Sequence, residues 1–477
     1  MKYIYGHILT LVTVALLLAS CAGESYPGME YEYVLNEDII NDESGKTNDR
    51  GVMIEVYLAP DTYTMGSVST TRGTGPFIVP DTIRQDSNRY ERSVFNVFAF
   101  RASPDDQGML DYSPDYTKRS NDPNDAKVNC LVDGSNYNLG APSRLDLNRS
   151  GKLHFKHYDM LNDSLLYYSA KYNDVGYNFF AYHLDDFVPT EATTHRTTEG
   201  ICYDIDIDGT RDLMYGYAPK LTSDVLDSLI IKDNLVIEDV QRNHILNIGY
   251  YSSYAAYHGV RPYVNLKHAL TRLRFMAYPA DATCDSVTIE AIEILAHNKV
   301  HLWVARPNAG EVGLTFEPER AYVPLMDHNA TTHPDSVGIL PYQPLRTEGN
   351  TVNWQPEYEG NGWKDNPPTI IGGDMLVPTD SVFRMKLTYR QTLKNIDPTT
   401  GKNITNRNTT TYDLRAPQVD VSYDERLRRY MYLPGHTYHI NIGVYGLRSI
   451  VVNTDVDGWG QGEDIPPNDE DDFDGNK

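Results

Sequence analysis

Apolar and polar residues alternate along much of this chain. The first clear stretch is 52–58, where Val52, Ile54, Val56 and Leu58 occupy every second position. Because alternate side chains of a β-strand point to the same face of a sheet, this period of two predicts a half-buried strand. The other predicted strands span residues 93–101, 167–168, 177–182, 203–208, 263–266, 272–278, 287–295, 300–304, 374–378, 381–389, 437–445 and 449–456. The pattern, together with 36 tyrosines, predicts a mainly β protein.

Residues 220–255 break this pattern. Val225, Leu226, Leu229 and Ile230 are apolar at mixed spacing, and they follow a Thr-Ser-Asp sequence that is typical of a helix N-terminus. We expect a small, helical insertion near a domain boundary.

The length of the chain predicts more than one domain. At 477 residues it exceeds the size, about 250 to 300 residues, at which a single core stops growing. We expect an N-terminal domain at 51–219 and a C-terminal domain at 256–460, joined by the insertion. Residues 21–50 are polar and acidic and predict a tether, and residues 461–477 predict a disordered acidic tail.

The start of the chain predicts a lipoprotein signal peptide over residues 1–20. Lys2 and an apolar run at 8–18 lead into Leu-Ala-Ser-Cys, with Cys21 as the last residue. The run is about half of the ~20 residues that a membrane-spanning helix needs. We therefore expect Cys21 to carry lipid and to hold the chain on a membrane. The alternative is an ordinary secretory signal with a chance cysteine, and both interpretations place the mature protein outside the cytoplasm.

The charge of the chain argues against a nucleic-acid partner. It has 42 basic and 66 acidic residues, a net charge of −24, whereas phosphate binding depends on Lys and Arg. An acidic surface also repels anionic lipid, so the lipid on Cys21 would supply the membrane attachment.

The sequence predicts no metal site among its cysteines. Cys130, Cys202 and Cys284 remain after Cys21, far apart and without a Cys-x-x-Cys pair. We interpret them as small buried apolar residues. The sequence does not decide whether two of them form a disulfide.

Two other sequence patterns partly match known metal-binding motifs. Asp204, Asp206 and Asp208 with Gly209 match the first half of an EF-hand loop, but Tyr215 stands where a bidentate Glu is needed. We expect instead a hairpin with an acidic outer face.

The close histidine pairs are His154 with His157 and His297 with His301. Neither pair has the Glu of an H-E-x-x-H motif, and strand geometry holds the members of each pair apart.

No enzyme activity and no cofactor are predicted. The chain has no Gly-x-Ser-x-Gly, no P-loop and no Rossmann glycine pattern after a strand. Trp354 and Trp363 could stack on sugars, although aromatic residues more often pack loops and strands.

Several sequence blocks, taken in order, resemble one known family. They are the lipobox at Cys21 and residues 93–100, 167–168, 177–182, 212–214, 263–275, 289–294, 375–378 and 433–459. The most distinctive are His268-Ala269-Leu270 and the ending that runs from Gly435 to Trp459. On these blocks the chain resembles the fimbrillin-like lipoproteins, the pilins that Gram-negative anaerobes export as lipidated precursors.

The resemblance implies two tandem transthyretin-like β-sandwich domains and a polymer built by donor-strand exchange. In that family an arginine-specific protease cuts a loop of the N-terminal domain and removes the lipid-bearing first strand. A strand of another fimbrial subunit then fills the groove. Here the first strand would be the one that carries Val52, Ile54, Val56 and Leu58.

Two arginines are candidates for the cut. Arg72 follows the first predicted strand in a Thr/Gly-rich loop, so a cut there would release the strand, and we favour it. Arg50 precedes the strand and is the second choice.

The end of the chain favours a tip or accessory subunit over a shaft subunit. After Trp459 only an acidic tail with two prolines follows, and this cannot serve as an apolar donor strand. The resemblance thus implies an outer-membrane, surface-exposed precursor that enters a fimbrium and contributes to adhesion to a host or bacterial surface ligand. The alternative is an anchored surface lipoprotein that binds glycans.

Overall fold

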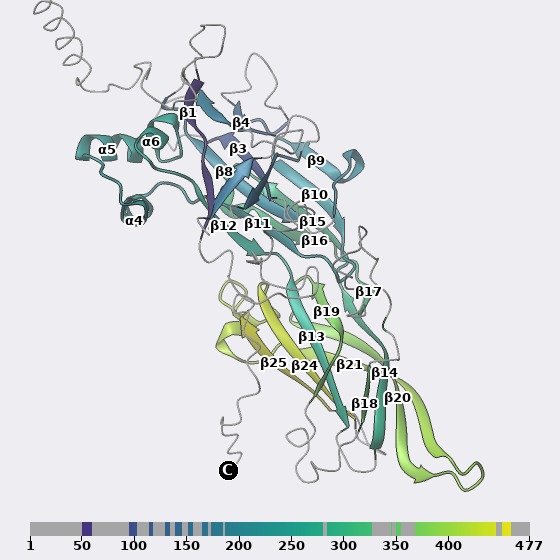
Figure 1. The fold of residues 1–477 in the computed structure, drawn as a ribbon. Helices are drawn as coiled ribbons and strands as arrows, with labels where there is room; N and C mark the ends of the chain where they lie inside the picture. The colour runs from purple at the N-terminus through teal and green to yellow at the C-terminus, as the bar shows by residue number, and fades with distance from the viewer. Residues whose placement is uncertain are drawn as a thin grey trace, which may run out of the picture. The chain divides into compact units, whose positions relative to one another are not determined.

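The computed structural model describes residues 50–59, 95–102, 114–117, 129–133, 139–145, 151–155, 165–169, 173–184, 187–279, 284–326, 345, 350–353, 368–444 and 451–458 (Figure 1). These residues are mainly β-strand, as the alternating pattern predicts. They divide into two compact units, and the smaller contains residues 50–54, 165–177 and 221–260 within the described ranges.

The smaller unit holds the predicted helical insertion. Its helices are α4 (Ser223–Asp233), α5 (Asp239–Ile248) and α6 (Ser253–Tyr257). The Thr222 hydroxyl accepts a hydrogen bond from the Val225 amide, 3.4 Å away, so the expected cap is formed. The same unit contains the antiparallel pair β1 (Arg50–Met53) and β7 (Tyr167–Ser169).

The larger unit contains one long sheet in the order β4-β3-β5-β6-β2-β12-β11-β8, and β3 also pairs with β8, so this order closes on itself. Its strands are β2 (Val56–Leu58), β3 (Phe95–Arg101), β4 (Cys130–Val132), β5 (Ala141–Leu145), β6 (Lys152–Phe155), β8 (Tyr177–Leu184), β11 (Leu213–Tyr217) and β12 (Tyr263–His268).

A second sheet of this unit has the order β16-β15-β10-β9 and is antiparallel throughout. Its strands are β9 (Thr194–Thr197), β10 (Gly200–Asp206), β15 (Lys299–Ala305) and β16 (Gly313–Phe316). Residues of both sheets, among them Phe98, Tyr182, Tyr203 and Leu302, form one buried core. The inner face of β10 therefore belongs to this core, and its outer face is left for other roles.

Two further sheets share another core. One has the order β19-β13-β24-β25 and the other β17-β14-β20-β21, with β18 also paired to β14. The strands are β13 (Thr271–Pro279), β14 (Cys284–Ala296), β17 (Ala321–Pro324), β18 (Thr351–Asn353), β19 (Thr369–Val377), β20 (Val382–Ile396), β21 (Asn403–Arg415), β24 (His436–Val444) and β25 (Val451–Gly458). Phe275, Ile289 and Met385 are among the residues buried between them.

The remaining described elements are short. They are the antiparallel pair β22 (Tyr423–Asp424) and β23 (Arg429–Tyr430), and the 3-10 helices η4 (Glu191–Thr193), η5 (Ala309–Glu311) and η9 (Asp420–Ser422). Among the described residues, no helix combines the length and the apolar character needed to cross a membrane.

The strand pairings cross the predicted domain boundary. β12, β15 and β16 come from the 256–460 range, yet they pair with strands of the 51–219 range. The domain limits and the transthyretin-like topology stay predictions.

The predicted hairpin at 203–208 is not formed, because β10 and β11 belong to different sheets. The turn itself is present. The Asp208 carboxylate accepts hydrogen bonds from the amide and hydroxyl of Thr210, and Gly209 has a φ of 84°.

Candidate functional site

Strand β2 has hydrogen-bonded neighbours on both sides. It runs antiparallel to β6, with Val56 opposite Leu153, and parallel to β12, with Val264 opposite Leu58. The Leu58 amide donates to the Gly151 carbonyl at 2.8 Å, and the Tyr57 amide donates to the Pro262 carbonyl at 2.9 Å. Removing β2 would therefore leave unpaired backbone groups on both neighbours.

The side chains of β2 alternate as the sequence predicts. Val56 and Leu58 are buried, with 0% and 1% of their surface exposed. The Tyr57 ring lies 5.1 Å from the Tyr263 ring, centroid to centroid. The strand thus fills an apolar slot on one side of the sheet and makes an aromatic contact on the other.

The first predicted strand is in fact two strands with different partners. Val52 lies in β1, which pairs with β7, whereas Val56 and Leu58 lie in β2. Between them Ile54 is buried and donates its amide proton to the Leu166 carbonyl. The apolar period continues through the break because it specifies which face is buried and not which strand is the neighbour.

Glu55 separates the two strands and is held by two cations. Its carboxylate forms ion pairs with Lys152 on β6 and with Arg261, just before β12. Burial raises the pKa of Glu55. The hydrogen bond from Lys152 and the charges of Arg261 and Lys152 together lower the pKa by more than burial raises it, so the net pKa is lowered. This carboxylate therefore connects the segment that enters β2 to both neighbouring strands.

We expect Glu55→Gln to lower the free energy of unfolding at pH 7. A lowered carboxyl pKa adds stability above the unfolded-state pKa, about 4.3, and this stability is lost as the pH falls through the folded-state pKa. The variant should therefore lose part of the decline in stability below that pH. Urea unfolding at a series of pH values measures both effects. The exposed Glu191→Gln should leave the pH 7 stability unchanged, and an equal loss in both variants would contradict the role of Glu55.

The other predicted site residues are placed as follows. Arg50 is the first residue of β1, and its backbone pairs with Ser169. Cys21, Arg72, Trp354 and Trp363 lie outside the described residues.

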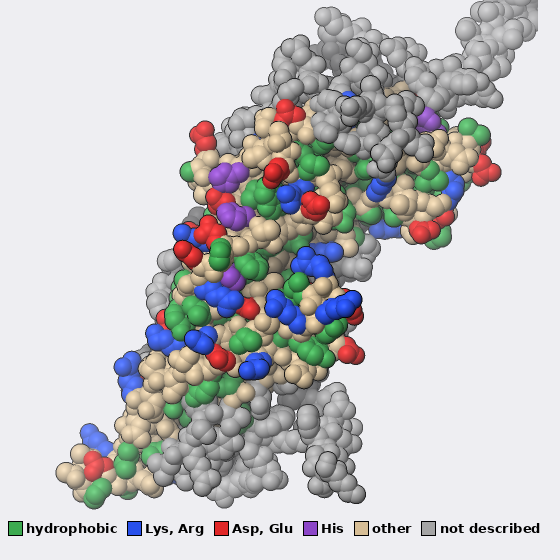
Figure 2. Space-filling model, turned by 180° about the vertical axis from the view of Figure 1, so that it is seen from behind, with side chains coloured by type: hydrophobic (Ala, Val, Ile, Leu, Met, Phe, Trp, Pro, Cys, Tyr) green, Lys and Arg blue, Asp and Glu red, His purple; other side chains and the backbone are tan. Residues whose placement is uncertain are grey.

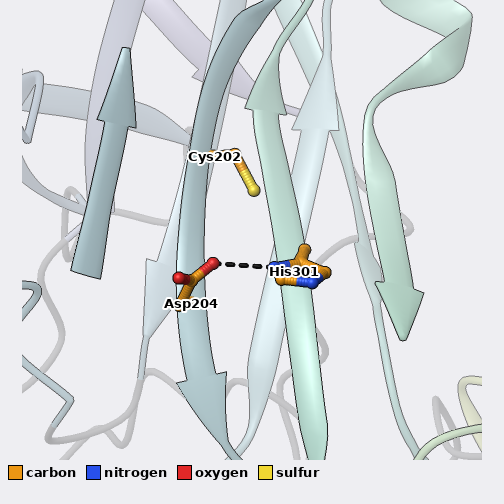
Figure 3. Close-up of side chains that lie close together, drawn as sticks. All are labelled: Cys202, Asp204 and His301. Atoms are coloured by element: carbon orange, nitrogen blue, oxygen red, sulfur yellow. Dashed lines mark hydrogen bonds and ion pairs between the residues drawn. The ribbon is translucent and has the colours of Figure 1, made fainter. Parts of the chain in front are cut away.

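A second group of polar side chains lies on the outer face of β10. Asp204 accepts from two histidines: His195 Nε2 lies 2.6 Å from Asp204 Oδ2, and His301 Nδ1 lies 2.7 Å from Asp204 Oδ1. Cys202 precedes Asp204 by two residues, so its sulfur lies on the same face, above the Asp204–His301 pair (Figure 3). His195 and His301 come from β9 and β15, the two strands that flank β10.

The environment of this group shifts two pKa values. Burial raises the pKa of Asp204, but the hydrogen bonds and charges of His195 and His301 outweigh it and lower the net value. Burial and the nearby Asp204 charge raise the pKa of the Cys202 thiol to about 12, against a smaller opposite effect of Arg306. Cys202 is thus a thiol at neutral pH, and it is one of two buried free cysteines, with Cys130, in the described part of the chain.

The EF-hand interpretation remains excluded by the partners of the aspartates. Asp204 binds histidines, whereas Asp208 contacts Thr210 and Arg211. The two carboxylates therefore do not converge on one point.

The histidine pair at 297 and 301 also separates. His297 Nδ1 lies 2.7 Å from the Glu317 carbonyl, whereas His301 faces Asp204. Sequence spacing alone could not find the group on β10, because Asp204 and His301 are 97 residues apart.

Elsewhere on the surface, charges of both signs lie close together, as Figure 2 shows for one face of the molecule. Pairs on β14, β20 and β21 include Lys386 with Glu293 and Arg407 with Glu290, both at 2.6 Å from nitrogen to oxygen. These exposed pairs are worth little each in stability.

Comparison with known proteins gives matches among solved structures. No protein-family model and no curated protein matches the chain. A fimbrial protein from Bacteroides vulgatus is 12% identical with a TM-score of 0.42, and the match covers 86% of this chain and 99% of that one. The fimbrial anchor protein Mfa2 from Porphyromonas gingivalis is 12% identical with a TM-score of 0.28, covering 86% and 98%. The tip fimbrial protein Mfa3 from Porphyromonas gingivalis, with a C-terminal truncation, is 10% identical with a TM-score of 0.29, covering 85% and 100%.

These similar structures are fimbrial proteins. At 10–12% identity and TM-scores of 0.28 to 0.42, each named role, anchor or tip, is that of the neighbour alone.

Proposed function

We propose that this chain is a cell-surface fimbrial subunit that is exported as a lipoprotein, activated by proteolysis and assembled by donor-strand exchange. The lipid on Cys21 holds the precursor at the outer membrane. An arginine-specific protease cuts the chain, and the body is released when a strand of another subunit replaces the lipid-bearing fragment. The subunit then joins other fimbrial subunits and contributes to adhesion.

The position of β2 carries this proposal. β2 is a short strand near the start of the chain, and it lies between β6 and β12 in the interior of a sheet. Loss of such a strand leaves two rows of unpaired N–H and C=O groups beside an apolar slot, which is a template for an added strand.

The strand boundaries favour Arg72 over Arg50 as the cut. Arg50 is the first residue of β1, so a cut after it would leave β1 and β2 attached to the body. Arg72 follows Leu58, the last residue of β2, so a cut there separates both strands from the body.

Cleavage at Arg72 gives a direct test. The precursor is treated with an arginine-specific protease, and the new N-terminus of the body is sequenced. We expect a terminus at Gly73, its loss in Arg72→Lys if the protease excludes lysine, and its retention in Arg50→Lys. A terminus at Gly51, or a precursor that is never shortened and binds no fimbrial partner, would contradict the proposal.

The C-terminal strands support a tip or accessory position. β25 pairs along its length with β24 in its own sheet, from Val451 opposite Gly443 to Gly458 opposite His436. The tail that follows is acidic and contains Pro466 and Pro467. Because β24 and β25 pair with each other in their own sheet, neither is free to be given to the next subunit of a shaft.

A further inference from the structure

The group on the outer face of β10 has the donor atoms of a transition-metal site. Cys202 offers a sulfur, Asp204 a carboxylate oxygen and His301 a ring nitrogen, and one such atom from each lies within 4.8 Å of the other two. Ligands around a tetrahedral zinc ion, bound at 2.0 to 2.3 Å, are about 3.3 to 3.8 Å apart. Shifts of about an ångström in side-chain position would therefore bring the three atoms to this geometry.

The backbone fixes this arrangement. Cys202 and Asp204 are two residues apart on β10, and Asp204 lies directly opposite His301 on β15. Main-chain hydrogen bonds between the paired strands hold the three ligands beside one another, so only their side chains need to move. Asp204 and His301 are partly exposed, with 41% and 36% of their side-chain surface accessible, which leaves an entry path for an ion.

Another aspartate–histidine pair, elsewhere in the described part of the chain, has no described cysteine beside it as a third donor. His244 and Asp174 in the smaller unit are 2.9 Å apart from Nε2 to Oδ1, and they are not part of a group of three His, Cys, Asp or Glu donors in the described residues. The buried sulfur beside Asp204 and His301 is what separates a metal site from an ordinary surface pair.

We propose that Cys202, Asp204 and His301 bind Zn²⁺, with His195 as a positioning residue on the second oxygen of Asp204. Sulfur and nitrogen donors suit zinc, whereas Ca²⁺ and Mg²⁺ require oxygen ligands. Binding exchanges the thiol proton of Cys202, which passes to solvent, for a sulfur–zinc bond, and no electron is transferred. The bound ion would cross-link β10 to β15.

Metal titration of the full chain tests this proposal. Zn²⁺ binding is measured by competition with a chromophoric chelator, and Co²⁺ is used as a spectroscopic probe of sulfur ligation. We expect one equivalent of Zn²⁺, a near-ultraviolet sulfur-to-cobalt band, and no binding of Ca²⁺ or Mg²⁺ at the same concentrations. Because the ion binds only the folded sheet, Zn²⁺ should also raise the thermal unfolding temperature.

Single variants separate this site from nonspecific binding. Cys202→Ser should remove the cobalt band, and Asp204→Asn and His301→Gln should each weaken Zn²⁺ binding by about tenfold or more. His244→Gln removes a histidine from a matched ion pair and should change neither. Circular dichroism of each variant without metal checks that it folds. Equal Zn²⁺ binding by all variants, or less than one equivalent by the unaltered chain, would overturn the proposal.

Discussion

After cleavage at Arg72, the severed N-terminal fragment should stay bound to the body, and Leu58→Asp should release it. The unaltered fragment is held by the buried Val56 and Leu58 side chains and by main-chain hydrogen bonds to both neighbouring strands. Each of these side chains is worth about 1.5 to 3 kcal/mol when fully buried. An aspartate at position 58 loses this contribution and places an unpaired carboxylate in an apolar slot, at a cost of several kcal/mol.

Size-exclusion chromatography of the cleaved protein measures the result. The unaltered fragment should co-elute with the body, and the Leu58→Asp fragment should elute separately. The uncut Leu58→Asp precursor is checked for folding first, and Leu58→Ala, which leaves a cavity and no charge, provides an intermediate case.

Tyr57→Thr is the matched control on the same strand. Its side chain points away from Leu58, and the change removes the ring contact with Tyr263, worth about 0.5 to 1.5 kcal/mol, while leaving the buried face of β2 intact. Its fragment should remain bound. A synthetic peptide of residues 50–59 should in turn occupy the slot vacated by the Leu58→Asp fragment. Release of the unaltered fragment immediately after cleavage would contradict the role of β2 as a retained strand.

The sequence predicted which residues face the core, but not which strands are neighbours. Val56 and Leu58 are buried as expected, because a period of two encodes a face of a sheet. The parallel partner of Leu58 is Val264, more than two hundred residues later, and no local pattern encodes that pairing. For the same reason the sequence does not predict that β15 and β16 form one sheet with β9 and β10.

Local signals sufficed where the structure is local. The helix that begins at Ser223 follows from its cap and from the loss of strand periodicity. The group around Asp204 is the opposite case, since it forms only when β9, β10 and β15 lie side by side. In the sequence, Asp204 belongs to an incomplete calcium-binding loop and His301 to a histidine pair without a metal-binding motif, so the two residues occur in unrelated patterns.

Substitutions in the buried ion pair of Arg196 and Asp133, in the larger unit, should cause a large loss in the free energy of unfolding. The guanidinium of Arg196 faces the carboxylate of Asp133, with Nη2 2.9 Å from Oδ2, and their side chains are 7% and 0% exposed. Arg196 also donates from Nε to the Tyr116 carbonyl and lies 5.8 Å from the ring centroids of Phe98 and Phe100. Arg196→Met or Asp133→Leu should each lower the free energy of unfolding by about 3 to 5 kcal/mol, because each leaves a buried charge without its partner.

The double variant tests whether the unpaired charge causes this loss. Replacing both residues removes both charges, so Asp133→Leu with Arg196→Met should cost less than the sum of the two single changes. Urea unfolding, followed by tyrosine fluorescence, gives the four free energies of the cycle. The exposed pair of Arg384 and Asp413, 3.0 Å apart from Nε to Oδ1 and 53% exposed on each side, is the matched control. Arg384→Met should leave the free energy of unfolding nearly unchanged, because a solvent-exposed ion pair adds little stability. Additive losses at Asp133 and Arg196 would instead attribute the effect to lost packing against the phenylalanine rings, since packing does not return when the second charge is removed.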